Sequence, residues 1–376
     1  MQQKIQMVDL KTQYLKIKPE IDNAIFSILE STTYIKGESV KIFEDKLSKF
    51  LDVKHAISCA NGTDALQIAL MGLGLSVGDE IITSSFTFIA TAEVIALLKL
   101  TPVLVDVDPG TFCINPVEIE KKITSKTKVI IPVQLFGQCS DMNRIMQIAY
   151  KYNLYVIEDA AQSLGSEYTF DNGVKKMAGT MGTVGTTSFF PSKNLGCFGD
   201  GGAMLTNDDK LAEHLRSISN HGMKKRYYHD LIGVNSRLDT LQASILNVKL
   251  DYLESYNKSR QDAASYYDSR FIDCKHLTIP YRNSSSTHIF HQYTLLMDKE
   301  ENFKMVEYLK TKDIPSMVYY PVPIHLQKAY QVYGYKTGDL PVTEKLCKRV
   351  FSLPMHSELT TEQQNIIIEN VLNYFK

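Results

Sequence analysis

One lysine lies where an apolar stretch of the chain turns into a glycine-rich segment. Lys193 follows the run TSFF at 187–190, and glycines stand at positions 196, 199, 201 and 202. A lysine held among apolar groups loses solvation of its charged form, which lowers the pKa of the amine and makes it a usable nucleophile. Taken alone, this pattern fits an ordinary loop lysine equally well.

Two acidic residues end a second apolar stretch. Glu158 and Asp159 follow residues 154–157 directly. A carboxylate at the end of a buried strand is unfavourable unless it has a cationic partner, such as a protonated ring nitrogen. An acid that only caps the next segment is the alternative, but a cap does not need two acids, so the pattern favours a functional role.

A third segment has the form of a strand end, a glycine turn and a helix start. In residues 59–66, Gly62 and Thr63 stand where free backbone N–H groups and the helix dipole attract an anion. The segment matches neither GxxxxGK[ST] nor GxGxxG, and a simple helix cap by Asn61 or Thr63 explains it as well. Phe88, at another such junction, is either a core residue or a flat surface for a flat ligand.

Together these features describe one kind of site. An anion cradle, a flat aromatic face, an acid for a ring nitrogen and a lysine amine are the groups that pyridoxal 5'-phosphate requires. The lysine would form a Schiff base, and the acid would keep the ring nitrogen protonated so that the ring withdraws electrons.

The elements that must position these groups follow a regular alternation. Short apolar runs predict strands, and helical spacing of apolar residues predicts helices. The expected strands are 55–60, 80–85, 102–107, 128–133, 154–157, 183–190 and 202–206. The expected helices between them are 62–73, 87–98, 116–123, 142–152 and 208–218. This alternation predicts an α/β fold whose mostly parallel sheet has helices on both faces and its site beyond the strand ends.

The remaining segments suggest a second, smaller unit. Helices are expected at 19–29 and 38–51, and one long helix at 238–267. Beyond it, a strand at 292–297, a helix at 302–310 and the segment 341–350 fit an α+β domain. We therefore expect a large domain over 1–250, which holds the cofactor, and a small domain over 251–376.

Composition excludes several classes of function. The 376 residues are 44% hydrophobic and 22% charged, with a net charge of −1. These values predict a soluble globular protein without affinity for nucleic acid or an anionic membrane. The N-terminus does not resemble a signal peptide, and the six cysteines are too scattered for a disulfide framework or a zinc site. A cytoplasmic protein without a metal is expected.

The chain resembles the DegT/DnrJ/StrS sugar aminotransferases, which use pyridoxal phosphate. The segments that carry the resemblance are SCANGTDAL (58–66), SFTFIATAE (85–93), PVLVDVDPGTF (102–112), VIEDAAQS (156–163), SFFPSKNLGCFGDGG (188–202), GVNSRLDTLQASIL (233–246) and YYPVPIHLQKAY (319–330). The resemblance implies a type I aspartate-aminotransferase fold, with a three-layer large domain and a smaller C-terminal domain. It also implies a homodimer with shared active sites.

The resemblance also assigns roles to individual residues. Lys193 is implied to be the Schiff-base lysine and the acid/base of the 1,3-proton shift, with Asp159 at the pyridinium nitrogen. The other implied cofactor contacts are Gln162 near the phenolic oxygen, Phe88 stacked on the ring, Gly62, Thr63 and Ser188 at the phosphate, and Asn235 reaching it from the neighbouring subunit.

The expected reaction is transfer of an amino group from L-glutamate to a nucleotide-linked keto sugar. Relatives that carry histidine in place of the lysine are dehydratases, so Lys193 favours transamination. A non-catalytic regulator that retains the fold is a third class. The runs CANGTDALQI, SFFPSK and GVNSRLDTLQA are similar to members that aminate UDP-2-acetamido-2-deoxy-3-oxo-glucuronate at C3 for surface polysaccharide such as O-antigen.

Candidate residues for the sugar are Arg237, Tyr319, Tyr320 and His325. An arginine can pair with a carboxylate through two hydrogen bonds, so Arg237 could select a uronate. The same NSRLD run occurs in relatives acting on dTDP-3-keto-6-deoxyhexoses, and Tyr319 stands where uronate-specific members carry histidine. The alternative acceptors are therefore a dTDP-3-keto-6-deoxyhexose, UDP-3-keto-N-acetylglucosamine or a 4-keto sugar.

Overall fold

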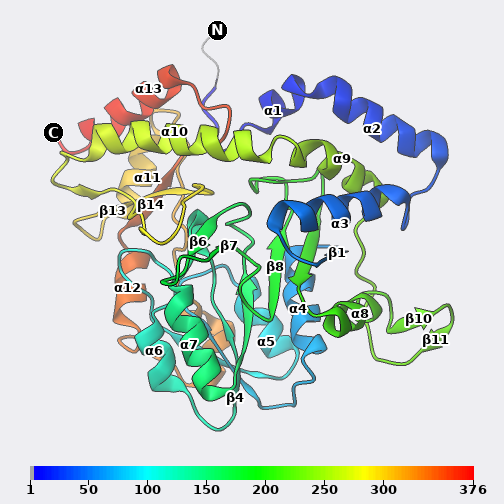
Figure 1. The fold of residues 1–376 in the computed structure, drawn as a ribbon. Helices are drawn as coiled ribbons and strands as arrows, with labels where there is room; N and C mark the ends of the chain where they lie inside the picture. The colour runs from blue at the N-terminus through cyan, green and yellow to red at the C-terminus, as the bar shows by residue number, and fades with distance from the viewer. Residues whose placement is uncertain (1–3) are drawn as a thin grey trace.

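A seven-stranded sheet forms the centre of the computed structural model, which describes residues 4–376 (Figure 1). Across the sheet the strands are β1 (His55–Cys59), β9 (Gly202–Thr206), β8 (Val184–Ser188), β5 (Tyr155–Asp159), β4 (Thr127–Ile131), β2 (Glu80–Ser84) and β3 (Thr101–Val105). Strand β9 runs antiparallel to both of its neighbours, β1 and β8. The other neighbouring pairs are parallel, which confirms the predicted mostly parallel sheet.

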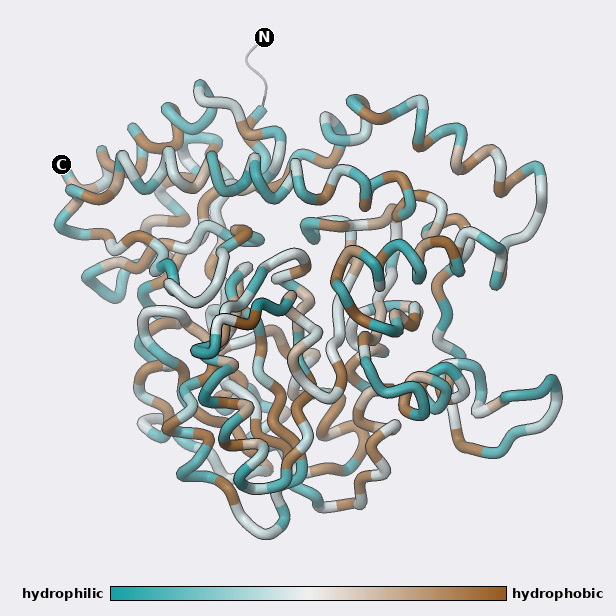
Figure 2. Tube along the Cα trace, viewed as in Figure 1, coloured by the Kyte–Doolittle hydropathy of each residue, from teal (hydrophilic) through white to brown (hydrophobic). Residues whose placement is uncertain are grey.

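Successive residues of each strand point to opposite faces of this sheet. In β2, Ile81 packs with α4 (Gly62–Gly72), α5 (Ala90–Leu97) and α8 (Asp209–Ile218). Its neighbour Ile82 packs on the other side with α6 (Pro116–Lys122) and α7 (Met142–Tyr152). Figure 2 shows the hydrophobic residues gathered on the central strands. Burial on both faces explains why these strands are apolar without alternation.

The N-terminal helices lie along one edge of the large unit. They are α1 (Leu10–Lys16), α2 (Lys18–Ser31) and α3 (Glu38–Leu51). Residues of α3 pack against β1 and β9 in a common core with α9 (Thr240–Leu250). Helix α2 contacts α9 through Ile21 and Ile245, so the beginning of the chain is held by a helix from a distant part of the sequence.

The single helix expected at 238–267 is wrong. Helix α9 ends at Leu250, and α10 (Leu253–Phe271) begins after two turn residues. At the break, the N–H groups of Asp251 and Tyr252 donate to carbonyls three residues earlier, those of Val248 and Lys249. This tighter pattern interrupts the α-helical ladder, and because the segment contains neither glycine nor proline, the sequence gives no sign of it.

The C-terminal part builds a smaller antiparallel sheet from β12 (Leu277–Thr278), β13 (Tyr293–Met297) and β14 (Val350–Leu353). Helices α10, α11 (Asn302–Lys310) and α13 (Thr361–Asn373) share one core with it. Ile5, near the start of the chain, also packs in this core. The domain division at residue 250 stays a prediction, and Ile5 shows that the two proposed units exchange contacts.

Short elements complete the fold. Two hairpins, which the sequence analysis did not anticipate, are β6 (Glu167–Thr169) with β7 (Lys175–Met177) and β10 (Met223–Lys225) with β11 (Tyr228–His229). The second hairpin projects away from the body (Figure 1). The 3-10 turns are η1 (Leu135–Gly137), η2 (Ile324–Leu326) and η3 (Lys328–Tyr333). Over residues 4–376, none of the helices is both long and apolar enough to cross a membrane.

A buried carboxylate joins the C-terminal part to the central sheet. Asp106, just after β3, accepts hydrogen bonds from the N–H groups of Thr343 (2.7 Å) and Val342 (2.9 Å) and from the Thr343 hydroxyl (2.7 Å). These donors belong to the first turn of α12 (Pro341–Cys347). Asp106 therefore acts as an N-terminal cap for α12, although it comes from a distant segment of the chain. Its negative charge also interacts favourably with the positive end of the helix dipole.

Replacing Asp106 by alanine should destabilise the protein, because it leaves the N–H groups of Val342 and Thr343 at the start of α12 without their acceptor. We expect Asp106→Ala to lower the free energy of unfolding by about 2 kcal/mol, measured by urea denaturation. Asp262→Ala is the matched control, since Asp262 only forms an exposed ion pair with Lys258 and should leave the midpoint unchanged. Equal midpoints for Asp106→Ala and the native protein would contradict this account.

Candidate active site

A cavity of about 480 Å³ opens beyond the carboxyl ends of the parallel strands. Elements far apart in sequence meet there, because parallel strands bring their carboxyl ends to one edge. Most of the residues predicted from the sequence line it, namely Gly62, Thr63, Phe88, Asp159, Gln162, Ser188, Lys193, Tyr319 and Tyr320. One chain therefore supplies all of these residues to the same cavity.

One end of the cavity is formed by the start of α4. Asn61 caps this helix by accepting a hydrogen bond from the N–H of Asp64 (2.8 Å), as the capping interpretation predicted. Capping and anion binding are compatible here, since Gly62 and Thr63 still line the cavity at the positive end of the helix dipole. A Cβ on Gly62 would lie 2.6 Å from the Ser188 Cβ, so only glycine allows the turn to approach β8 this closely.

The two acids at the end of β5 have different surroundings. Glu158 is fully buried and accepts hydrogen bonds from the N–H groups of Gly179 (3.0 Å), Met181 (2.6 Å) and Gly182 (2.8 Å). It also accepts one from the Gln134 side chain (2.9 Å). Glu158 therefore anchors the loop before β8, and this explains its presence without any role in the cavity.

Asp159 faces the cavity instead. Its Oδ2 accepts a hydrogen bond from the Thr91 hydroxyl (2.7 Å), and its Oδ1 accepts one from the N–H of Ala161 (3.2 Å). Burial raises the pKa of Asp159, although these two donors and the charge of Lys193 favour the ionised form. A carboxylate in this position gains stability from any cation placed in the cavity.

Lys193 shares this enclosed space. Burial lowers the pKa of Lys193 to about 8, while the charge of Asp159 acts in the opposite direction. At neutral pH a fraction of the amine is therefore uncharged and able to act as a nucleophile. The local pattern left a loop lysine open as an alternative; the structure places the residue in the cavity that also contains the acid.

Two aromatic residues, Phe88 and Tyr320, form one wall of the cavity. Phe88 is 56% exposed, and its ring centroid lies 6.5 Å from that of Tyr320. Helix α5 begins at Ala90 rather than at residue 87, so Phe88 stands in a loop beside the cavity and not in the core. The Gln162 side chain donates to the Tyr320 hydroxyl (3.0 Å) and accepts from the N–H of Phe136 (2.8 Å), which fixes its orientation.

Three predicted residues lie elsewhere in the described chain. Asn235 is exposed and pairs with Asn220 in an isolated bridge. Arg237 lines a separate groove of about 480 Å³ that also contains Lys36. The His325 ring is fully buried between the Ser85 hydroxyl (2.8 Å) and the Glu344 carboxylate (3.1 Å). Among the described residues that line the active cavity, none of the three is found.

The cavity also contains residues that the sequence analysis missed. His291 and Gln292 reach it from the segment before β13, and Thr91 supports Asp159 from α5. His291 lies about a hundred residues beyond Lys193 and belongs to no motif of chemical meaning. The polar cluster HQY at 291–293 inside an apolar segment was the one available signal.

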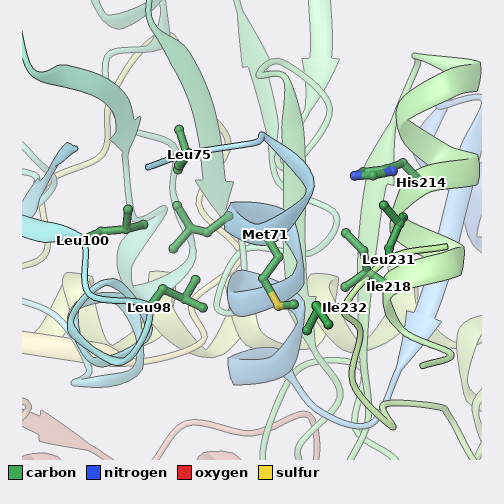
Figure 3. Close-up of a pocket in the computed structure, with 9 residues that line it drawn as sticks. Met71, Leu75, Leu98, Leu100, His214, Ile218, Leu231 and Ile232 are labelled. Atoms are coloured by element: carbon green, nitrogen blue, oxygen red, sulfur yellow. The ribbon is translucent and has the colours of Figure 1, made fainter. Parts of the chain in front are cut away.

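A second pocket, of about 280 Å³, has a different character (Figure 3). Met71 at the end of α4 and Leu75 lie across from Ile218 of α8 and Ile232. Leucine and isoleucine side chains form most of its wall, together with His214. It presents an apolar surface without the acid and amine that characterise the cavity around Lys193.

Comparison with known proteins places the whole chain in one family. The DegT/DnrJ/EryC1/StrS aminotransferase family matches residues 15–372. The chain is 46% identical to UDP-2-acetamido-2-deoxy-3-oxo-D-glucuronate aminotransferase of Pseudomonas aeruginosa, over 98% of this chain and 100% of the relative. It is 44% identical to a pleiotropic regulatory protein of Geobacillus stearothermophilus, over 99% of both chains. It is 42% identical to UDP-N-acetyl-3-dehydro-alpha-D-glucosamine 3-aminotransferase of Acidithiobacillus ferrooxidans, over 96% of this chain and 95% of the relative.

Solved structures agree with this placement. The fold superimposes on DesV of S. venezuelae, solved in complex with a ketimine intermediate, with a TM-score of 0.94 and 35% identity over 99% of this chain and 98% of that one. NtdA of Bacillus subtilis, solved with bound cofactor PMP, gives a TM-score of 0.87 and 32% identity over 95% of this chain and 82% of that one. The predicted type I aminotransferase fold is therefore confirmed, and the chain belongs to the DegT/DnrJ/EryC1/StrS aminotransferase family.

Proposed function

We propose that this chain transfers an amino group from L-glutamate to C3 of a nucleotide-linked 3-keto sugar. The observation that carries the proposal is a single cavity in which an amine, a carboxylate and a helix N-terminus meet. Similarity to the P. aeruginosa enzyme supports UDP-2-acetamido-2-deoxy-3-oxo-glucuronate as the acceptor, and hence a role in surface polysaccharide biosynthesis.

The residues of the cavity fit pyridoxal phosphate as the cofactor. The amides of Gly62 and Thr63 and the Ser188 hydroxyl form a cradle for the phosphate, and the close approach of Gly62 to Ser188 keeps the cradle narrow. The carboxylate of Asp159 suits a protonated ring nitrogen, and Phe88 offers a face for the ring. When bound, the cofactor supplies an electron-withdrawing ring that stabilises negative charge on the substrate carbon next to the transferred nitrogen.

Lys193 performs the covalent and proton-transfer work of this chain. With pyridoxal phosphate bound, the uncharged Nζ of Lys193 would be the group that holds the cofactor covalently, and the same atom would take up and release the proton during amino transfer. A pKa of about 8 suits both tasks, since it keeps the protonated and neutral forms accessible at neutral pH. We assign to Gln162, whose orientation is set by Phe136 and Tyr320, the contact with the phenolic oxygen of the cofactor.

Sugar recognition involves a second copy of the chain. In a homodimer, Asn235 and Arg237 of one subunit complete the active site of the other, which accounts for their position outside this cavity. Burial and the charge of Arg237 lower the pKa of Lys36 in the same groove, and within residues 4–376 neither cation has an acidic ion-pair partner. A carboxylate or phosphate of the acceptor would neutralise this charge.

Alternative acceptors differ from a uronate in charge. UDP-3-keto-N-acetylglucosamine is supported by the A. ferrooxidans relative, and a dTDP-3-keto-6-deoxyhexose by the NSRLD segment that such enzymes share. Neither has the C6 carboxylate that Arg237 is proposed to bind. Similarity to a regulatory protein keeps a non-catalytic role as the contrasting hypothesis, which Lys193 in the cavity argues against.

The ionisation of Lys193 gives a prediction that does not depend on the sugar. In the cofactor-free protein, labelling of Lys193 by an amine-directed reagent should rise through a midpoint at about pH 8, because the neutral amine is the reactive form. A reference lysine peptide has its midpoint at about 10.4. Asp159→Asn should lower the Lys193 midpoint further, since the Asp159 charge stabilises the ammonium. An unchanged or higher midpoint in that variant would contradict the proposed pairing.

Removal of either group should stop catalysis. We expect Lys193→Ala to reduce turnover by roughly a thousandfold or more and Asp159→Ala by nearly as much, measured with glutamate and the uronate acceptor. Lys175→Ala, which removes an exposed lysine, is the control. Adding glutamate to the native enzyme should abolish the visible band of the bound cofactor. A native enzyme whose band does not respond would favour the regulator, and an active Lys193→Ala variant would exclude the assigned role.

The acceptor can be identified by running the reaction backwards. A panel of nucleotide-linked 3-amino and 4-amino sugars is offered to the enzyme, and the productive sugar is the one that abolishes the visible cofactor band. We expect the 3-amino uronate to react, and Arg237→Ala to impair it at least tenfold more than a neutral 3-amino sugar. Arg237→Lys is the matched control that keeps the charge. Equal losses on charged and neutral sugars would show that Arg237 does not select the carboxylate.

A further inference from the structure

The Gln162 amide has a single favourable orientation in the active cavity. Its Oε1 accepts a hydrogen bond from the backbone N–H of Phe136 (2.8 Å), and its Nε2 donates to the Tyr320 hydroxyl (3.0 Å). A flipped amide would place its own hydrogens against the Phe136 N–H, where neither group has an acceptor. The turn that carries this N–H is itself held, because the carbonyl of Phe136 accepts a hydrogen bond from the N–H of Gln292 (3.3 Å).

This orientation determines what the Tyr320 hydroxyl can do. Because Gln162 is the donor, the Tyr320 oxygen is the acceptor in this bond, and its own hydrogen is not used there. Within residues 4–376, the Tyr320 hydroxyl forms no hydrogen bond to a second group. A hydroxyl whose oxygen already accepts a hydrogen bond is polarised and becomes a better donor.

The hydroxyl end of Tyr320 belongs to the active cavity. Tyr320 and Gln162 both line the cavity, and the hydroxyl is the point at which they meet. Lys193, Asp159 and Asp200 line the same cavity. In the part of the chain that the structure describes, none of these three charged groups forms a hydrogen bond with the hydroxyl. Its hydrogen is therefore available to a molecule in the cavity.

Aromatic packing fixes the direction of the phenol ring. The Tyr320 ring lies edge-on to the fully buried ring of Phe86, with centroids 6.0 Å apart at an interplanar angle of 79°. Phe86 also packs edge-on against Phe136 (6.3 Å, 89°), the residue that orients Gln162. The hydroxyl and the amide are thus held by one aromatic cluster, and a donor held in this way needs no reorganisation when a ligand arrives.

The phenol also keeps its hydrogen. Burial raises the pKa of Tyr320 above its ordinary value, and the charge of Asp159 acts in the same direction, whereas the hydrogen bond from Gln162 acts in the opposite one. At neutral pH the hydroxyl is therefore a neutral donor and not a base.

We propose that Tyr320 is a catalytic hydrogen-bond donor to the carbonyl oxygen of the keto substrate. In pyridoxal phosphate, the carbon at which amino transfer occurs is attached to the ring beside the phenolic oxygen, the atom assigned to Gln162. A donor 3.0 Å from the Gln162 amide would therefore stand beside the reacting carbonyl group. Negative charge develops on that oxygen when a nitrogen adds to the carbonyl carbon, so the hydrogen bond from Tyr320 is strongest in the transition state.

This inference rests on the proposed aminotransferase function, but not on the identity of the sugar. The keto sugar and 2-oxoglutarate exchange nitrogen with the same atom of the cofactor, so both carbonyl oxygens would meet the same donor. Tyr320 remains protonated throughout, and the hydrogen bond is its whole contribution.

A single-atom change tests the role in catalysis. Tyr320→Phe keeps the ring in the aromatic cluster and removes only the hydroxyl. We expect kcat to fall roughly a hundredfold, the effect of one lost donor to a developing oxyanion, with a smaller change in the KM for the acceptor. Tyr335→Phe is the matched control, since the Tyr335 hydroxyl accepts from the N–H of Leu104 (2.8 Å) outside the cavity and should leave kcat unchanged.

The visible band of the bound cofactor separates this role from an indirect one. A Tyr320 that acted only by orienting Gln162 toward the phenolic oxygen would change the pH midpoint of this band when its hydroxyl is removed. We expect the native midpoint in Tyr320→Phe, because Phe136 still holds the amide, and a shifted midpoint in Gln162→Leu. A shifted midpoint in Tyr320→Phe would overturn the proposal.

Infrared spectroscopy reports on the hydrogen bond without turnover. The probe is 2-oxoglutarate labelled with carbon-13 at its keto carbon, bound to the enzyme whose cofactor carries no amino group, so that it cannot react. We expect a lower C=O stretching frequency in the native enzyme and in Tyr335→Phe than in Tyr320→Phe. Equal frequencies in native and Tyr320→Phe enzymes, or a native kcat in Tyr320→Phe, would refute this inference alone. A native enzyme whose cofactor band does not respond to glutamate would instead refute the proposed function.

Discussion

The burial of opposite charges at the end of a parallel sheet is the constraint on which this site depends. Asp159 and Lys193 both leave water when the chain folds, and each changes the ionisation of the other. Their attraction offsets only part of the desolvation, so the cavity favours a ligand with a cationic ring nitrogen and an electrophilic carbon. Neighbouring segments complete the site. The Thr91 hydroxyl orients the Asp159 carboxylate, and the turn after Asn61 supplies the N–H groups of the anion cradle.

A low lysine pKa is not by itself the signature of the site. Burial also lowers the pKa of Lys249 to about 8, but this residue lies in α9 and donates to the carbonyl of Gly196. Lys249 therefore supports the loop that follows Lys193 and has no access to the cavity. Glu158 and Asp159 show the same contrast. Glu158 binds the loop before β8, whereas the adjacent Asp159 lines the cavity. Access to the cavity, rather than burial, therefore distinguishes residues that can take part in a reaction from residues that only stabilise the fold.

The sequence predicted those features that depend on local pattern. Alternating apolar runs predicted the strands and helices of the large sheet, and the strand ends at Asp159 and Ser188 predicted the residues that meet there. Features set by tertiary contacts were missed. The break between α9 and α10 comes from backbone bonding without glycine or proline. His291 reaches the cavity because the small sheet folds back onto Asn194, and no spacing in the sequence records that approach.

The antiparallel strand β9 has a consequence for the motion of Lys193. Strands β1, β2 and β3 are each followed along the chain by a helix, so the loop after each of them is held by the sheet at one end only. The segment after β8 returns directly along β9, and the N–H of Phe189 donates to the carbonyl of Gly201 across its base (2.7 Å). The loop that carries Lys193 is thus held at both ends by the sheet, which lowers its conformational entropy before any ligand binds. Lys193 is therefore carried by a segment that the sheet fixes on both sides, whereas Phe88 stands in a loop on another wall of the cavity.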